Sequence, residues 1–224
     1  MGGRTLAIGD VHGCDVALSQ LLEMLAPTNN DTVVVLGDIV DRGPGSRQVI
    51  ETLIELAGSC HLVFLLGNHE EMMLDAIQAG ADDSSWLMFG GGNTLDSYGG
   101  LVENIPREHL DFLTSGKDWW ETDADILVHA GVDPDLPLQS QTGHALRWQH
   151  LTGFERPHQS GKRVICGHTP LQSGAPWVGP GWVGIDTFCC GGLYLTGLDL
   201  RSELVYQASQ SGHTRQGLTL DELS

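Results

Sequence analysis

The stretch that decides the fold is TLAIGDVHG, residues 5–13. A short apolar run, Thr5–Ile8, is typical of a buried strand, and it ends at once in a glycine and Asp10. The apolar periodicity over Cys14–Leu25 predicts that a helix follows. The stretch therefore predicts a strand–loop–helix unit that carries two polar side chains, Asp10 and His12, at the carboxyl end of its strand.

The same alternation continues along the first half of the chain. We expect strands at Thr32–Leu36 and His61–Leu66, and helices at Ser46–Leu56 and from about Glu70 to Ala79. The near-continuous apolar run TVVVL suits a strand that is covered on both faces. Strands that alternate with helices predict α/β architecture.

The second half of the chain has short strands and few helices. Helices are expected only near Pro106–Leu113 and His144–Leu151. The expected strands are Ile126–His129, Arg163–Cys166, Trp182–Ile185, Leu193–Leu198 and Glu203–Tyr206. We therefore predict a single domain, residues 1–224, whose core of about 4–207 is a mixed, two-sheet α/β sandwich, followed by a polar tail at about 208–224.

The composition excludes several classes of protein. The 29 Asp and Glu against 11 Lys and Arg give a formal net charge of −18, which argues against binding to nucleic acid or to an anionic membrane surface. No apolar run reaches the length of a membrane span, about 18 residues. The N-terminal stretch MGGRTLAIGD shows no secretory signal, and the five cysteines have no framework spacing. We therefore expect a cytoplasmic protein with reduced thiols, and the sequence does not indicate an oligomeric state.

Polar side chains collect where the expected strands end, next to glycine. They are Asp10 and His12 after the first strand, Asp38, Asp41 and Arg42 after the second, Asn68 and His69 after the third, His129 after the fourth, and His168 after the fifth. Ligands of open α/β sheets bind outside the carboxyl ends of the strands, and glycine lets the backbone approach them closely. We therefore expect these side chains to meet in one site.

Six of these side chains have the chemistry of metal ligands: Asp10, His12, Asp38, Asn68, His129 and His168. Carboxylate, imidazole and amide donors suit manganese, iron or zinc. Six donors are too many for one zinc with an open position, but they suit two metals that share a carboxylate, for which Asp38 is the natural bridge. Two metals roughly 3.5–4 Å apart make hydroxide available at neutral pH and clamp the oxygens of a displacement at phosphorus.

The motifs GDVHG, GDIVDRG, GNHE, HAG and GH, in this order, resemble the phosphoprotein phosphatase branch of the calcineurin-like metallophosphoesterases. The similarity runs from Asp10 to Gly192, and Trp86-Leu87 followed by GGGNTLDSYG is similar to the small bacterial members. The resemblance implies a four-layer α/β/β/α sandwich. It also implies hydrolysis of phosphoserine and phosphothreonine by direct attack of hydroxide held between two metals. Small bacterial members often accept phosphotyrosine and small phosphoesters.

The resemblance also implies a role for each site residue. The implied ligands are Asp10, His12 and Asp38 for the first metal, and Asp38, Asn68, His129 and His168 for the second. The expected metal is manganese, with iron or zinc as alternatives. His69 would be the general acid, oriented by Asp41, and Arg42 would grip phosphate oxygens with its planar fork.

One part of the pattern departs from the family. Small bacterial relatives usually place a second phosphate-binding arginine two residues after a tryptophan, between HAG and GH. Here Arg147 stands just before Trp148, and His150 stands at the expected position. Either Arg147 reaches the phosphate from a shifted register, or His150 takes that place with less charge.

Three hypotheses for the function follow. The first is a metal-dependent phosphomonoesterase whose substrate is a phosphorylated protein or a small phosphoester. The second keeps the chemistry but takes a nucleotide, such as a dinucleoside polyphosphate or a cyclic nucleotide. The polyphosphate-cleaving branch typically has ARG where this chain has Asp41-Arg42-Gly43, which favours the first hypothesis. The third, a non-catalytic scaffold, is disfavoured because every ligand and acid position is filled.

Overall fold

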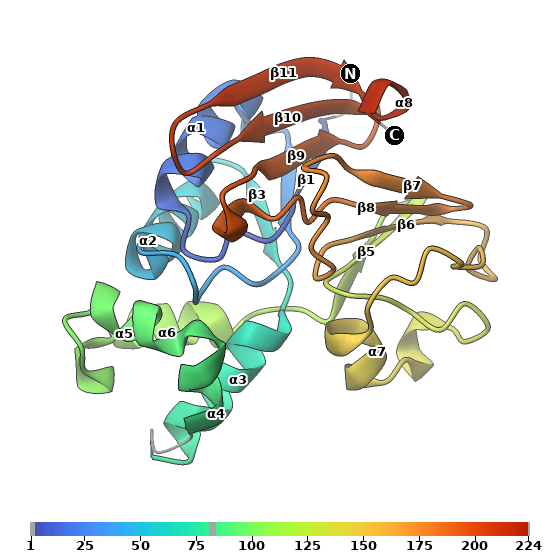
Figure 1. Ribbon diagram of the computed structural model, residues 1–224. Helices are drawn as coiled ribbons and strands as arrows, with labels where there is room; N and C mark the ends of the chain where they lie inside the picture. The colour runs from blue at the N-terminus through green and yellow to red at the C-terminus, as the bar shows by residue number, and fades with distance from the viewer. Residues whose placement is uncertain (1–2, 81–83, 224) are drawn as a thin grey trace.

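The computed structural model describes residues 3–80 and 84–223, which form two β-sheets packed face to face with helices outside them (Figure 1). The first sheet has the order β11 (Thr214–Thr219), β10 (Leu204–Ala208), β9 (Leu195–Asp199), β1 (Thr5–Ile8), β2 (Thr32–Val35) and β3 (His61–Phe64). The second has the order β4 (Trp119–Glu121), β5 (Asp125–Val128), β6 (Arg163–Cys166), β8 (Trp182–Gly184) and β7 (Trp177–Gly179). The prediction of a mixed, two-sheet α/β sandwich is confirmed.

Three neighbouring strands of each sheet run parallel. In the first sheet Thr5 pairs with Thr32, and Thr32 with His61, while β9 runs antiparallel to β1. In the second sheet β5, β6 and β8 are parallel, and β4 and β7 are antiparallel edge strands. The loops after β1, β2 and β3 therefore all lie at the carboxyl end of the parallel strands of the first sheet. The loops after β5 and β6 lie at the corresponding end of the second sheet.

The run of valines in β2 is buried on both faces. Val34 packs into the cluster between the two sheets, together with Leu127 and Ile165 of the second sheet. Val33 and Val35 belong to the cluster on the opposite face, under the helices. Successive residues of a strand point to opposite faces, so a continuous apolar run is required here.

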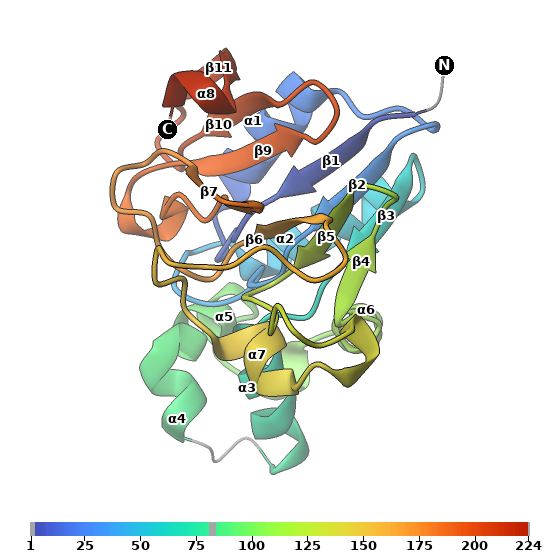
Figure 2. The ribbon, with the colours of Figure 1, turned by 90° about the vertical axis from the view of Figure 1, so that its right-hand side faces the viewer.

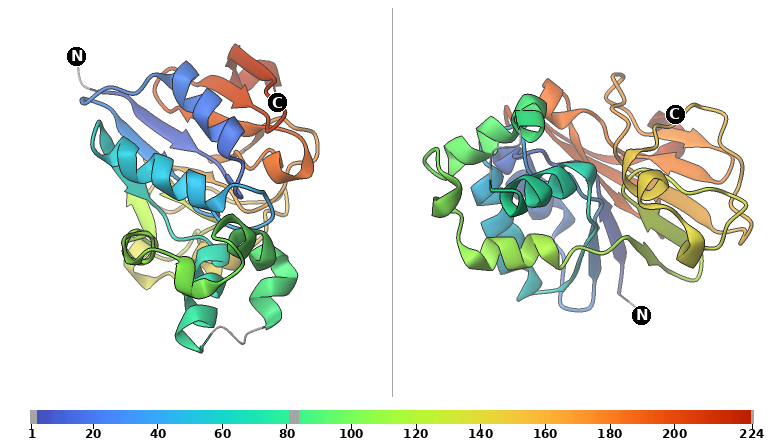
Figure 3. Two further views of the ribbon diagram at one scale, coloured as in Figure 1. Left: turned by 90° about the vertical axis from the view of Figure 1, so that its left-hand side faces the viewer. Right: turned by 90° about the horizontal axis from the view of Figure 1, so that it is seen from below.

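Helices cover the outer faces of the sandwich. Helices α1 (Asp15–Leu25) and α2 (Ser46–Ala57) lie over the first sheet (Figure 3), with α3 (Asn68–Gln78) and α6 (Arg107–Thr114) beyond them. On the other side, α7 (Gly143–Trp148) adds Leu146 to the outer cluster of the second sheet (Figure 2). The remaining short elements are η2 (Val102–Asn104), η3 (Leu138–Ser140), η4 (Cys189–Gly191) and α8 (Leu220–Leu223).

Several elements differ from the sequence expectation. Between α3 and α6 the chain makes an unexpected helical excursion through α4 (Ser84–Trp86), η1 (Leu87–Gly91), which is kinked where Gly90 has a non-helical φ of 112°, and α5 (Gly92–Ser97). The expected helix to Leu151 ends at Trp148, because Gln149 adopts an extended conformation. The stretch expected as a tail from about residue 208 contains β11, which pairs with β10 at the edge of the sheet. Within the described ranges, no helix combines the length and apolarity needed to cross a bilayer.

Candidate metal centre

The loops after β1, β2, β3, β5 and β6 bring together one group of polar side chains. All six expected ligands lie there; His168 is half-buried, and the buried ones are Asp10, His12, Asp38, Asn68 and His129. Donor atoms lie within 4.8 Å of one another in two groups: His12, Asp38 and His69, and Asp38, His129 and His168. Asp38 belongs to both groups.

Asp38 faces one imidazole with each carboxylate oxygen. Its Oδ2 lies 3.5 Å from Nε2 of His12, and its Oδ1 lies 3.5 Å from Nε2 of His129. Oδ1 also accepts the backbone N–H of His69 at 3.0 Å. Burial raises the pKa of Asp38, but the neighbouring histidines lower it by more, so the group is an ionised carboxylate. This is the geometry of a carboxylate shared by two cations.

Backbone carbonyls fix the tautomer of three histidines. His12 and His129 each donate their Nδ1–H to a carbonyl, over 3.0 Å and 2.8 Å, and the ring of His168 also bonds a backbone group. The backbone partners are, in order, those of Val40, Leu36 and Trp148. Burial also lowers the pKa of His12 and of His168 to about 3. The rings are therefore neutral and carry their lone pair on Nε2, the nitrogen that can ligate a metal.

Two contacts inside the centre are unfavourable without a cation. Nε2 of His168 is buried and has no hydrogen-bond partner among the described residues. Nε2 of His129 lies 3.1 Å from Oδ1 of Asn68, so that two acceptors face each other. A buried polar atom without a partner costs about 1–3 kcal/mol, which a bound cation would relieve. The residues present therefore fit a pair of divalent cations.

His69 and Asp41 form a buried pair beside the ligands. Nδ1 of His69 donates to Oδ2 of Asp41 over 2.7 Å, and neither side chain is appreciably exposed. Burial lowers the pKa of His69, but Asp38 and the hydrogen bond to Asp41 raise it by more, so it lies above its ordinary value. The pair is built to hold a proton on the imidazole.

The guanidinium of Arg42 spans the mouth of the centre. Nη1 lies 2.7 Å from Nε2 of His12, and Nη2 lies 2.9 Å from Nε2 of His69. Five site residues have left-handed backbone, with φ of 45°, 47°, 71°, 66° and 62° for His12, Asp38, Asp41, Arg42 and His168. Such conformations cost energy and concentrate at functional sites, where the surroundings hold them.

Comparison with known proteins places the chain in a family. Residues 3–172 match the family of calcineurin-like phosphoesterases. The chain belongs to the calcineurin-like phosphoesterase family. The two groups of candidate ligands that share Asp38 agree with the dinuclear centre of this family.

Curated relatives of this chain carry two different names. The symmetrical bis(5′-nucleosyl)-tetraphosphatase of Nitrosomonas europaea is 34% identical over 167 residues, which cover 74% of this chain and 58% of that protein. Serine/threonine-protein phosphatase 1 of Salmonella typhimurium is 38% identical over 182 residues, which cover 74% of this chain and 78% of that protein. The chain spans about half the length of the tetraphosphatases that it matches.

Solved structures show the same fold. A putative diadenosine tetraphosphatase aligns with a TM-score of 0.71 at 21% identity, over 97% of this chain and 95% of that chain. A cold-active protein tyrosine phosphatase aligns with a TM-score of 0.70 at 16% identity, over 100% and 81%.

The structure separates the two residues considered for a second phosphate contact. Arg147 is held by two carboxylates, with Nε 2.8 Å from Glu71 and Nη1 2.7 Å from Asp118. The ring of His150 instead stacks on the expected ligand His168, with 4.5 Å between the ring centroids. Among the described residues, His150 therefore contacts an expected ligand, and Arg147 is engaged in ion pairs.

Asp186 is a buried carboxylate beside the candidate centre that none of the sequence motifs assigned. Asp186 is 4% exposed, and burial raises its pKa to about 6. The pKa of Asp10 is also raised, first by its own burial and second by the charge of Asp186. The pattern Gly184-Ile185-Asp186 directly after β8 could have identified it, because the other site residues also follow a strand end and a glycine.

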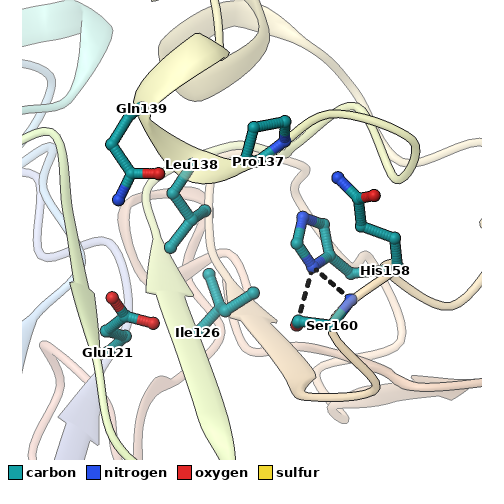
Figure 4. Close-up of a pocket in the computed structure, with 8 residues that line it drawn as sticks. Glu121, Ile126, Pro137, Leu138, Gln139, His158 and Ser160 are labelled. Atoms are coloured by element: carbon teal, nitrogen blue, oxygen red, sulfur yellow. Dashed lines mark hydrogen bonds between the residues drawn. The ribbon is translucent and has the colours of Figure 1, made fainter.

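A separate hollow of about 460 Å³ lies over the second sheet (Figure 4). Its lining residues are Glu121, Ile126, Pro137, Leu138, Gln139, His158, Gln159 and Ser160. His158 bonds Ser160 through Nδ1 and the carbonyl of Leu136 through Nε2, so both its ring nitrogens have partners. This hollow contains none of the expected ligands.

Proposed function

We propose that the chain hydrolyses phosphoric esters at the candidate metal centre, with Asp10, His12 and Asp38 holding one cation and Asp38, Asn68, His129 and His168 the other. The observation that carries the proposal is the placement of Asp38, whose two oxygens face His12 and His129 at equal distances of 3.5 Å. When bound there, two divalent cations, which we expect to be manganese with iron or zinc as alternatives, supply hydroxide at neutral pH and neutralise phosphate charge.

The chain's own residues bind the phosphate and move the proton. The planar fork of Arg42, at the mouth of the centre, suits two phosphate oxygens at once. His69 gives a proton to the leaving oxygen after phosphate draws Arg42 away from its Nε2, since the bond to Asp41 orients the ring and the raised pKa favours its protonated form. Arg147 is not free to join Arg42 unless its ion pairs to Glu71 and Asp118 break.

The names of the relatives favour a nucleotide substrate. Symmetrical bis(5′-nucleosyl)-tetraphosphatases recur among them, from Nitrosomonas europaea, Paracidovorax citrulli and Pectobacterium atrosepticum. A dinucleoside polyphosphate, the alternative in the sequence analysis, is therefore better supported by the comparisons than a phosphorylated protein.

One feature of the site favours a phosphomonoester of an alcohol. The Asp41–His69 pair is arranged for acid catalysis, which an alkoxide leaving group requires far more than a nucleoside diphosphate does. The 38% identity to a serine/threonine-protein phosphatase supports the same class. We therefore keep phosphoserine, phosphothreonine, phosphotyrosine and small phosphoesters as the second candidate class.

A substrate panel tests the proposal and separates the two classes. The manganese-loaded chain is offered diadenosine tetraphosphate, p-nitrophenyl phosphate and a phosphoserine peptide. We expect turnover of at least one, and a decrease in kcat of about 10²–10⁴-fold in His69→Ala for the peptide, with unchanged metal content. If none of the three is hydrolysed, the proposed function is wrong.

A further inference from the structure

The helical excursion after α3 encloses the carboxylate of Asp41. Nε1 of Trp86 lies 3.0 Å from both oxygens of Asp41, and Oγ1 of Thr94 lies 2.8 Å from Oδ1. Trp86, Thr94 and Asp41 are all buried, with at most 1% exposed. Together with Nδ1 of His69 on Oδ2, these donors leave the carboxylate no freedom to rotate.

Thr94 also holds the backbone of Asp41. Its Oγ1 accepts the backbone N–H of Asp41 at 2.8 Å, so one hydroxyl bonds both the main chain and the side chain of the same residue. Asp41 has a φ of 71°, a left-handed conformation that an ordinary side chain rarely adopts. The contacts of Thr94 therefore stabilise the conformation that points Asp41 at His69.

The same excursion packs against Arg42. The carbonyl of Gly90 accepts the backbone N–H of Arg42 at 3.3 Å, and Asn93 donates its side-chain N–H to the carbonyl of Arg42. A Cβ at Gly90, where φ is 112°, would lie 2.8 Å from the backbone nitrogen of Arg42. Trp86–Thr94 thus holds both residues of the Asp41-Arg42 pair.

We infer that Trp86 and Thr94 are positioning residues, which hold Asp41 so that it orients the imidazole of His69 toward the leaving oxygen. The inference rests on the proposed function and specifies its substrate class as esters with a strongly basic leaving oxygen. In the step, the bond from phosphorus to the leaving oxygen breaks as a bond from the attacking oxygen forms. Once bound phosphate draws Arg42 away from Nε2 of His69, a protonated imidazole passes its Nε2 proton to the leaving oxygen and becomes neutral.

The test compares two aryl phosphates that differ in the basicity of the leaving group. Phenyl phosphate releases the more basic oxygen and p-nitrophenyl phosphate the less basic one. We expect Thr94→Val and Trp86→Phe to lower kcat for phenyl phosphate by about tenfold or more, and for p-nitrophenyl phosphate by less than about threefold. KM and metal content stay unchanged, and Thr94→Ser, which keeps the hydroxyl, retains wild-type kcat.

Tyr98→Phe is the matched control, because it also removes one buried hydroxyl, bonded to Nδ1 of His109 at 2.7 Å, without touching Asp41. It should leave the ratio of the two kcat values unchanged. Equal losses on both substrates, or no loss in Thr94→Val, would overturn the inference. So would a wild-type chain that cleaves diadenosine tetraphosphate but no aryl phosphate. A wild-type chain inactive on all of these substrates would instead overturn the proposed function.

Discussion

At the residue scale, two glycines set how closely the carboxylates of the centre approach their neighbours. A Cβ on Gly167 would lie 2.0 Å from Oδ1 of Asp10, and a Cβ on Gly67 would lie 2.2 Å from Oδ1 of Asp38. Any larger residue would have to displace the carboxylate. The glycines that flank the strand ends are therefore part of the centre, although they contribute no donor atom.

Gly167→Ala should consequently weaken the metal centre more than the fold. The added methyl group displaces Asp10, so we expect less metal per chain and lower kcat. The free energy of unfolding, measured by denaturant titration, should fall by no more than for a typical substitution, about 1 kcal/mol. The control is Gly92→Ala, where a Cβ meets nothing within 4 Å and the backbone is helical. Wild-type metal content in Gly167→Ala would contradict the geometry described.

The residues also show what the sequence could reveal about the site. The ligands follow strand ends in short glycine-containing motifs, so local sequence was sufficient to group them. The partners of Arg147 are Glu71 and Asp118, which lie 76 and 29 residues away, and no local pattern indicates such ion pairs. The contacts of Trp86 and Thr94 to Asp41 span 45 and 53 residues and were equally inaccessible.

At the element scale, an ion pair fastens the starts of β1 and β2. Asp31, just before β2, accepts the backbone N–H of Arg4 at 2.7 Å and its Nη2 at 2.8 Å, and it also accepts the N–H of Thr28. Arg4 directly precedes β1. The guanidinium of Arg4 holds the pKa of Asp31 well below its ordinary value.

The stability from this pair should depend on pH in a defined direction. Because the folded-state pKa of Asp31 is lowered, its contribution is complete above the ordinary aspartate value, about pH 4, and is lost as the pH falls toward the lowered value. Asp31→Asn should lower the free energy of unfolding at pH 7 by about 1–3 kcal/mol, and by less at pH 3. Denaturant titrations at both pH values measure this.

The control for that experiment is Asp135→Asn. Asp135 pairs with Arg156 at 2.6 Å, but both side chains are 66% exposed, so its loss should have little effect. A pH-independent difference between Asp31→Asn and the wild type would show that the ion pair does not act as described.

The elements also differ in how far sequence predicts them. Thr5–Ile8 and Arg163–Cys166 are strands with the expected bounds, since continuous apolar runs identify buried strands. The excursion of α4, η1 and α5 contains three successive glycines, Gly90–Gly92, which give no helical periodicity. Its helical form depends on tertiary contacts such as that of Gly90 with Arg42.

At the scale of the whole molecule, the metal centre joins the two sheets. Asp10, His12 and Asp38 follow strands of the first sheet, whereas His129 and His168 follow strands of the second. A cation bound by residues of both sheets therefore links the two halves of the sandwich. Binding to the folded state alone stabilises it, by about 2.7 kcal/mol when the metal is at 100 times its Kd.

Removal of the metal should therefore lower the melting temperature of the entire domain. We expect a chelator to lower Tm in a single cooperative transition, and manganese to restore it. His129→Ala removes a ligand of the second sheet, so it should shrink the manganese-induced shift measured by calorimetry. A manganese shift in His129→Ala as large as that of the wild type would contradict the link between the sheets.

The most direct test of whether one carboxylate joins two cations begins with a chain from which a chelator has removed all metal. This chain is dialysed to equilibrium against manganese, and its bound metal is then measured. The geometry of Asp38 predicts two manganese ions per wild-type chain and at most one per chain in Asp38→Asn. Two ions per chain in Asp38→Asn, or fewer than two in the wild type at saturation, would contradict it.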